Sequence, residues 1–253
     1  MLVLPNRKTI LETLLATLPE GWQIHRLHLG VNWTLAQVQG PDGELRAGLA
    51  ASPPTEVVAG QSRFVIGDNA VGTEEAREVV GLALSPDMTA AALGLATLNA
   101  LLQPDPALLS DIDAGDWLLE QGRGKKLAVV GSFPFVAELR PMVAQLWVLE
   151  LQPKLGEYPA STAPEIIPQA DILAITGSTL VNHTLDDLLK LARPETKVMV
   201  LGPTTPLSPV LFDYGVDLLS GVQVVDVAAV LVSIEQGVSF RKMQGVRRVT
   251  LEK

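Results

Sequence analysis

Residues 170–192 hold the pattern that most constrains the fold, because an apolar run there breaks at a glycine and then resumes with helical spacing. The run 172–175 is typical of a buried strand, and Gly177 with Ser178 is typical of a turn. After the turn, apolar residues recur at the spacing of one helix face: Leu185, Leu188, Leu189 and Ala192. A strand, a turn and an amphipathic helix in this order form one unit of a parallel α/β sheet. In such sheets, ligands bind where strands end and the chain turns into the next element.

The same alternation of strands and helices runs through the second half of the chain. We predict strands at 127–131, 144–150, 172–175, 197–201 and 216–219, and a closing helix over 221–237 with Asp226 as its N-cap. Alternating strands and helices favour a parallel sheet between two helical layers. The predicted fold class is therefore α/β, with a Rossmann-like three-layer parallel sheet domain over residues 116–253.

The first half of the chain reads differently. Helical spacing is found at 5–18, 73–85 and 85–102, and two strand-like stretches at 23–39 and 44–50 are joined by Gly-Pro-Asp-Gly, a turn sequence. We therefore predict a smaller α+β domain over residues 1–115. The helix at 85–102 is rich in small residues, which let another backbone approach closely. Asn99 lies within it, either as a structural bridge or as part of a binding cleft.

Composition narrows the function classes. The chain has 253 residues, of which 47% are hydrophobic, so it can bury a core. A net charge of −9 argues against nucleic acid as a partner, since phosphate neutralisation requires clustered Lys and Arg. The absence of cysteine excludes disulfides and thiolate metal sites. No apolar run reaches the length of a membrane span, and no export signal is seen, which favours a cytoplasmic protein. The apolar segment 227–234 is compatible with a homodimer.

Polar residues gather in the loops after the first, third and fourth strands of the second half. Neutral hydroxyl and amide groups dominate there, with Glu150 and Asp226 as nearby acids and His183 as the one imidazole. No nucleophile–base pair can be assembled from these residues, and the dinucleotide motif G-x-G-x-x-G is absent after the first strand. Turn and cap formation is the alternative role for each of them. The loops contribute Ser132 and Phe133; Thr176, Ser178 and Asn182; and Thr204, Thr205 and Pro206.

Several motifs together resemble one family of proteins, described as putative heavy-metal chelation proteins. They are VVGSFPF (129–135), VLE (148–150), ITGSTLVNHTL (175–185), LGPTTPL (201–207) and the closing stretch 221–237. The resemblance implies a Rossmann-like C-terminal domain and an N-terminal domain like the N-terminal part of enolase. It also implies a ligand site in a cleft between the two domains. The residues implied for that cleft are Asn99, Gly131, Phe133, Pro134, Glu150, Thr176, Gly177, Asn182, Thr205 and Asp226.

One position departs from that family's pattern, because Ser132 stands where a histidine is expected in many relatives. The loss of an imidazole weakens direct binding of zinc, copper or nickel, which prefer imidazole and thiolate ligands. Glu150 and His183 remain as candidate metal ligands, and a divalent metal or a metal chelate is the implied cofactor.

Three functions are consistent with these observations. The first is binding of a small molecule, a metal or a metal complex through oxygen and amide groups. The second is an enzyme that holds a nucleotide or S-adenosyl cofactor on the Rossmann-like domain, with Glu150 on the ribose. The third is a scaffold that acts through a partner protein, with its polar loop residues serving only as caps.

Overall fold

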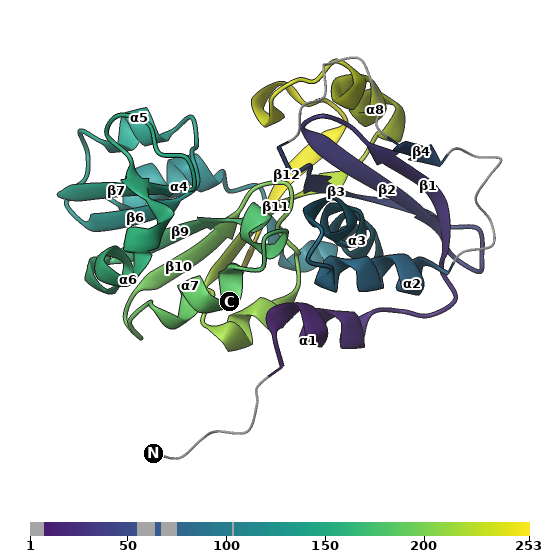
Figure 1. Ribbon diagram of the computed structural model, residues 1–253, viewed down its shortest axis with the longest axis horizontal. Coiled ribbons are helices and arrows are strands. Elements are labelled where there is room, and N and C mark those ends of the chain that lie inside the picture. The colour runs from purple at the N-terminus through teal and green to yellow at the C-terminus, as the bar shows by residue number, and fades with distance from the viewer. Residues whose placement is uncertain (1–7, 55–63, 67–74, 103) are drawn as a thin grey trace. The chain divides into compact units, whose positions relative to one another are not determined.

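The computed structural model describes residues 8–54, 64–66, 75–102 and 104–253. The chain divides into two compact units. Unit 1 comprises the described residues of Met1–Leu102 together with Leu180–Asn182 and Asp226–Gly245. Unit 2 comprises the described residues of Gln103–Thr179 together with His183–Val225 and Val246–Lys253. Each unit has its own sheet (Figure 1).

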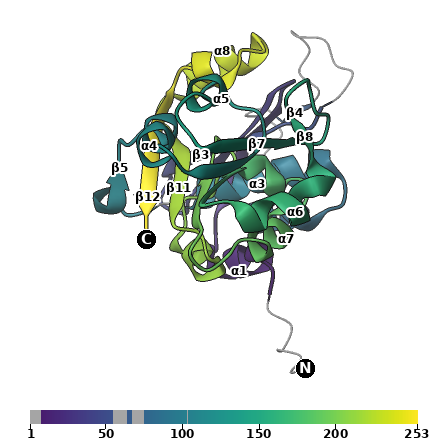
Figure 2. The same ribbon diagram turned by 90° about the vertical axis from the view of Figure 1, so that its left-hand side faces the viewer.

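Unit 2 is built on an eight-stranded sheet in the order β5-β12-β11-β10-β9-β6-β7-β8. The six strands from β8 to β11 are parallel, and β12 and β5 add antiparallel pairs at one side. Figures 1 and 2 show α4 and α5 on one face of the sheet and α6 and α7 on the other. The strands are β5 (Leu109–Ser110), β6 (Lys126–Val130), β7 (Gln145–Glu150), β8 (Tyr158–Pro159), β9 (Ile172–Thr176), β10 (Lys197–Leu201), β11 (Leu218–Val224) and β12 (Val246–Glu252). The helices are α4 (Ala114–Gln121), α5 (Val136–Leu139), α6 (Ala163–Ile166) and α7 (Leu185–Lys190).

The core beneath α4 and α5 is formed by apolar side chains that point to the same face of the parallel strands. Every second residue of each strand points to the same face, so Leu127 and Val129 of β6 join the corresponding residues of β7, β9 and β10. Leu118 of α4 and Leu139 of α5 cover them and are fully buried. The predicted α/β class, with a parallel-sheet domain between helical layers, is confirmed.

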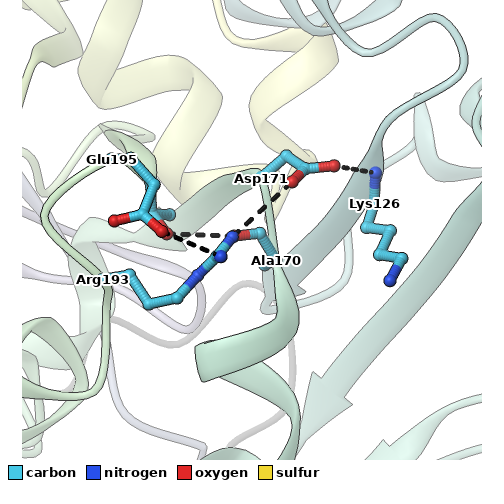
Figure 3. A network of polar contacts seen from close by, with 6 residues as sticks. Lys126, Ala170, Asp171, Arg193 and Glu195 are labelled. Atoms are coloured by element: carbon cyan, nitrogen blue, oxygen red, sulfur yellow. Dashed lines mark hydrogen bonds and ion pairs between the residues drawn. The ribbon is translucent and has the colours of Figure 1, made fainter.

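The parallel strands begin at one edge of the sheet, which we call the amino edge. Aspartate side chains there accept hydrogen bonds from the backbone of neighbouring strands. The Asp171 carboxylate accepts a hydrogen bond of 2.9 Å from the backbone N–H of Lys126, and so joins the starts of β9 and β6. Arg193 holds this aspartate from the other side, at 3.6 Å, while it also pairs with Glu195 and donates to the Ala170 carbonyl (Figure 3). These charges stabilise the sheet and line its amino edge.

Asp217 repeats this arrangement one strand pair further along. Its carboxylate accepts from the backbone N–H of Val198 at 2.8 Å and pairs with the Lys197 ammonium at 3.0 Å. A charged acceptor strengthens each of these bonds relative to a neutral pair. The starts of β6, β9, β10 and β11 are therefore tied together by side chains as well as by the strand ladder.

Unit 1 contains a four-stranded antiparallel sheet in the order β3-β2-β1-β4. The helix α3 lies directly on β3, where Gly48 leaves room for the helix backbone at Ala96 and Ala100. Asn99 of α3 donates from Nδ2 to the Leu49 carbonyl at 2.8 Å and so bridges helix and strand. The strands are β1 (Gln23–Leu29), β2 (Trp33–Gln39), β3 (Leu45–Ala51) and β4 (Phe64–Ile66); the helices are α1 (Ile10–Thr17), α2 (Ala76–Gly81) and α3 (Met88–Leu101).

A late segment of the chain completes unit 1. The helix α8 (Val227–Glu235) packs on β2, and the Trp33 indole N–H donates to the Val238 carbonyl at 3.0 Å. Trp33 and Gly48 lie on opposite faces of the sheet, because Gly48 pairs with Ala36, an odd number of residues from Trp33. The sheet of unit 1 is therefore covered by α3 on one face and by residues 233–240 on the other.

Several sequence-based boundaries need correction. The stretch 23–39 is two strands separated by a turn, and 221–224 belongs to β11, so the closing helix begins only after its N-cap, Asp226. The helix expected over 5–18 is described from Ile10, with residues 5–7 outside the described chain; residues 73 and 74 of the expected helix 73–85 also lie outside it. The helix expected from residue 85 begins at Met88, because Asp87 caps it.

The predicted domain ranges 1–115 and 116–253 differ from the division into units in two places. The described part of unit 2 already begins at Pro104, and residues 226–245 belong to unit 1 because α8 packs on β2. The likeness of the first domain to the N-terminal part of enolase stays an expectation from the sequence.

Gly48→Ala is predicted to destabilise the protein by about 3 kcal/mol, because the added methyl group overlaps the backbone of α3. Gly81→Ala is the matched control: no atom lies within 4 Å of the position of the added carbon, and the residue is helical. We expect that control to raise stability by about 0.5 kcal/mol. Urea denaturation measures both. Equal effects of the two substitutions would contradict the close approach of α3 to β3.

His28 is predicted to make stability pH-dependent. The side chain is 3% exposed, and burial lowers its pKa below the ordinary value of 6.5; the Arg26 charge adds to this shift and Glu235 opposes it. The unfolded chain therefore binds a proton that the folded chain does not, and stability falls as the pH drops below about 6.5. His28→Gln should flatten the dependence of urea midpoints between pH 7.5 and 5.0, with His25→Gln as the same-strand control. An unchanged slope in His28→Gln would contradict this assignment.

Candidate functional site

The order of the parallel strands locates the place in unit 2 where ligands bind in related sheets. Numbered along the chain from β6 to β11, the order is 3-2-1-4-5-6. The chain leaves β6 toward β7 on one side and leaves β9 toward β10 on the other, so β6 and β9 flank the point where the strand order reverses. Ligands of open α/β sheets bind at this point, outside the carboxyl ends of the strands. We call this side of the sheet the carboxyl edge.

Glycines and threonines interlock along the carboxyl edge. Gly131 follows β6 with φ +106°, and a Cβ there would lie 3.1 Å from the Thr176 side chain at the end of β9. Gly177 follows β9, and a Cβ there would lie 2.6 Å from the Thr205 backbone nitrogen and 2.8 Å from its hydroxyl. Because neither glycine has a side chain, Thr176 can pack against Gly131 and Thr205 can pack against Gly177. The segments after β6, β9 and β10 are therefore in close contact.

The Thr205 hydroxyl is the exceptional group at this edge. The residue is 3% exposed, and its Oγ1 atom is buried without a hydrogen-bond partner among the described residues. A buried hydroxyl that makes no hydrogen bond costs about 1–3 kcal/mol. Buried polar groups in folded proteins are almost always paired, so an unpaired one at the carboxyl edge is a candidate contact for a ligand.

The other hydroxyls of the loop after β9 serve the loop itself. Thr179 is 3% exposed and donates to the Thr176 carbonyl at 2.7 Å. The Ser178 backbone N–H donates to the Thr176 hydroxyl, which in turn donates to the Ser178 hydroxyl at 3.2 Å. For these residues the turn and cap role is realised in the structure, and Ser178 remains half-buried.

The loop after β6 presents aromatic rings. Phe133 and Phe135 stack with their ring centroids 5.1 Å apart and their planes 10° apart, and both are half-buried. Ser132 and Pro134 are exposed, and Pro134 has no N–H to donate. The helix that follows, α5, has only four residues. This loop therefore offers fewer backbone donors, and a shorter helix behind them, than a dinucleotide loop that binds phosphate.

Glu150 and Pro206 complete the predicted residues of unit 2. Glu150 ends β7, the strand beside β6, and is half-buried, with its carboxylate accepting from the Leu151 backbone N–H at 3.2 Å. Pro206 is buried behind Thr205, and its carbonyl accepts from the Ser208 N–H.

Three of the predicted residues belong to unit 1. Asn99 bridges α3 and β3, and Asp226 caps α8 by accepting from the Ala229 N–H at 3.1 Å. Asn182 is half-buried. Two of the three therefore have a structural role within their own unit, and their place in a shared ligand site stays a prediction.

Within the described chain, no group of three or more His, Cys, Asp or Glu residues is arranged to hold a metal ion. His183 is exposed and has φ 58°, a left-handed conformation that is uncommon outside glycine. Glu150 contributes a carboxylate to an edge at which the other predicted residues of unit 2, His183 apart, are glycines, prolines, hydroxyl residues and a phenylalanine. The donors at the carboxyl edge are suited to hydrogen bonds with the periphery of a ligand.

Sequence reasoning did not identify Phe135 or Gly202 as part of this edge. Gly202 follows β10 with φ +107°, and no atom lies within 4 Å of where its Cβ would be. The signals were present, because Gly202 follows a strand as Gly131 does, and Phe135 is two residues from Phe133 in the same loop.

Comparison with known proteins gives the family. The family model DUF364, described as "Putative heavy-metal chelation", matches residues 113–253, more than half of the chain. The chain belongs to this family. A second model with the same description, DUF4213, matches residues 11–102. The resemblance seen in the sequence motifs is therefore confirmed.

Two solved structures of DUF364 proteins share the fold, and both are described as being of unknown function. One, from Desulfitobacterium hafniense, is 28% identical with a TM-score of 0.78, and the other, from Pyrococcus horikoshii, is 25% identical with a TM-score of 0.80. In both comparisons, 96% of this chain and 98% of the other are covered. An uncharacterized protein of Methanocaldococcus jannaschii is 28% identical over 69% of this chain and 71% of its own length.

The structure bears on one further expectation from the sequence. None of the described helices is both long and apolar enough to cross a lipid bilayer. The cytoplasmic location, the homodimer and the exclusion of nucleic acid stay predictions.

Two threonine substitutions are predicted to change stability in opposite directions. Thr205→Val removes a buried hydroxyl without a partner and should raise the free energy of unfolding of the ligand-free protein by about 1 kcal/mol. Thr179→Val, at equal burial, removes a hydroxyl that donates to Thr176 and should lower it by about 1 kcal/mol. Denaturant unfolding of both variants measures this difference. A loss of stability in Thr205→Val as large as in Thr179→Val would show that Thr205 has a partner.

Proposed function

We propose that this protein binds a small molecule at the carboxyl edge of the unit 2 sheet, and that the ligand is a metal complex or a metal-chelating compound. The observation that carries the proposal is the Thr205 hydroxyl, which follows β10, lies beside Gly177 at the end of β9, and is buried without a partner among the described residues. A ligand atom that accepts or donates one hydrogen bond there would offset the cost of burying that hydroxyl.

The family description supports chelation as the coarse role. The residues of the carboxyl edge fit a complex better than a bare ion. Zinc, copper and nickel favour several imidazole or thiolate ligands, whereas this edge offers hydroxyls, phenyl rings and the Glu150 carboxylate. In this proposal the organic part of the ligand supplies most of the metal donors, and the protein recognises the complex from outside.

A second candidate function is an enzyme with a nucleotide or S-adenosyl cofactor. The strand order favours it, because Glu150 ends β7, which takes the second place in the 3-2-1-4-5-6 order. In dinucleotide-binding sheets an acid near that position bonds the ribose hydroxyls. Against it stands the loop after β6, with one glycine and with Pro134 where N–H groups are needed.

Calorimetric titration of the full-length, chelator-treated protein tests the proposal. The ligands are Zn²⁺, Ni²⁺ and Cu²⁺ alone, the same metals as 1:1 phenanthroline complexes, adenosine and S-adenosylmethionine. We expect a complex to bind and Thr205→Val to weaken it by about five- to ten-fold, the value of one hydrogen bond. Thr196→Val is the control, since Thr196 is a buried threonine at the amino edge that donates to the Ala170 carbonyl.

Each alternative predicts a different outcome. If only adenosine or S-adenosylmethionine binds, and Glu150→Gln weakens it, the enzyme candidate replaces the chelation proposal. If every ligand that binds has the same affinity for Thr205→Val as for the wild type, the carboxyl edge is not the site. If none of the ligands binds, the scaffold function becomes the best account.

A further inference from the structure

We infer that the ligand presents a planar aromatic ring, neutral or positively charged, to the stacked pair Phe133 and Phe135. This inference rests on the proposed function and deepens it, because it names the chemistry of the ligand at the same edge.

The position of the aromatic pair is the first argument. Phe133 and Phe135 follow β6 directly, at the point where the strand order reverses. A Cβ on Gly131 would lie 3.3 Å from the Phe133 ring and 3.1 Å from the Thr176 side chain, so the ring lies beside the glycine–threonine contacts. The same edge holds the Thr205 hydroxyl. Phe133 follows β6 and Thr205 follows β10, two strands away in the sheet, so a flat ligand about 10 Å across can reach both groups.

The partial exposure of the pair is the second argument. Both rings pack against the core beneath α4 and α5, yet both remain half-buried. Aromatic rings attract other rings in stacked or edge-to-face arrangements, and the stacked geometry of this pair, with planes 10° apart, extends such a surface. A flat ring gains more from this surface than a saturated group of the same charge.

The distribution of charge is the third argument. The loops 131–135, 176–184 and 202–208 contain no Lys or Arg. The loop after β6 is also poorly suited to phosphate, as Pro134 has no N–H and α5 is only four residues long. Glu150 places a carboxylate at the end of the neighbouring strand β7. Phenyl faces and a carboxylate both attract a cation, so the edge favours a neutral or cationic ring over a phosphate ester.

A pair of zinc complexes tests the inference. Zn²⁺ with one 1,10-phenanthroline and Zn²⁺ with one ethylenediamine carry the same charge and the same number of nitrogen donors, but only the first has a flat ring. We expect the full-length protein to bind the phenanthroline complex about ten-fold more tightly in calorimetric titration. Phe133→Leu should remove this preference and leave the affinity for the ethylenediamine complex unchanged.

Two further variants serve as controls. Phe212→Leu removes a half-buried phenylalanine of unit 2 near the amino edge, where Lys253 donates to its carbonyl, and should preserve the ten-fold preference. If Phe133→Leu does not fold, Phe135→Leu removes the other ring of the stack and is measured in its place. Circular dichroism melting establishes that each variant is folded at the temperature of titration.

The outcomes separate this inference from the proposed function. Equal affinities for the two complexes, both weakened by Thr205→Val, would overturn the ring preference and leave the binding site standing. A preference for phenanthroline that survives Phe133→Leu would place the ring elsewhere and also overturn the inference. Binding of neither complex, or binding that is indifferent to Thr205→Val, would overturn the proposed site and this inference together.

Discussion

The parallel alignment of β6, β9 and β10 is the constraint on which the candidate site depends. Ile175 of β9 pairs with Val130 of β6 and with Val200 of β10, so the three strands end side by side. Gly131 therefore meets Thr176, and Gly177 meets Thr205. A shift of one residue would turn every apolar side chain to the opposite face and separate these contacts. The carboxylates of Asp171 and Asp217 hold the other ends of the same strands.

The two edges of this sheet have opposite chemical characters. The amino edge carries ion pairs among Asp171, Arg193 and Glu195. Arg193 Nε is also buried without a hydrogen-bond partner among the described residues. The carboxyl edge carries glycines, hydroxyls and two phenyl rings, and it includes a buried hydroxyl for which the described part of the chain offers no partner. Charged groups gather at the end where the strands begin, while the carboxyl edge holds mainly neutral groups beside the Glu150 carboxylate. This difference supports the proposal that a ligand would be recognised at the carboxyl edge by stacking and by single hydrogen bonds.

The sequence was sufficient to predict the strands β6, β9 and β10 and their loops, because each is a continuous apolar run followed by a glycine. It was not sufficient for residues 221–224, an apolar run whose strand character depends on pairing with β12 far along the chain. The packing of α8 on unit 1 depends on Trp33, some 200 positions earlier, and no local pattern shows it. The polar loops could be predicted as a group. Which hydroxyl lacks a partner could not be predicted. Thr179 finds its acceptor three residues earlier in its own loop, whereas the surroundings of Thr205 depend on how the loop after β9 packs against it.

The central claim is that Thr205 faces a ligand, and a crystal structure of the full-length protein with the zinc–phenanthroline complex tests it most directly. The account predicts ligand density at the carboxyl edge of unit 2, with a ligand or ligand-bound water atom about 3 Å from Thr205 Oγ1 and the phenanthroline ring against Phe133. Density for the complex at another surface, with Thr205 Oγ1 still without a partner, would contradict the account.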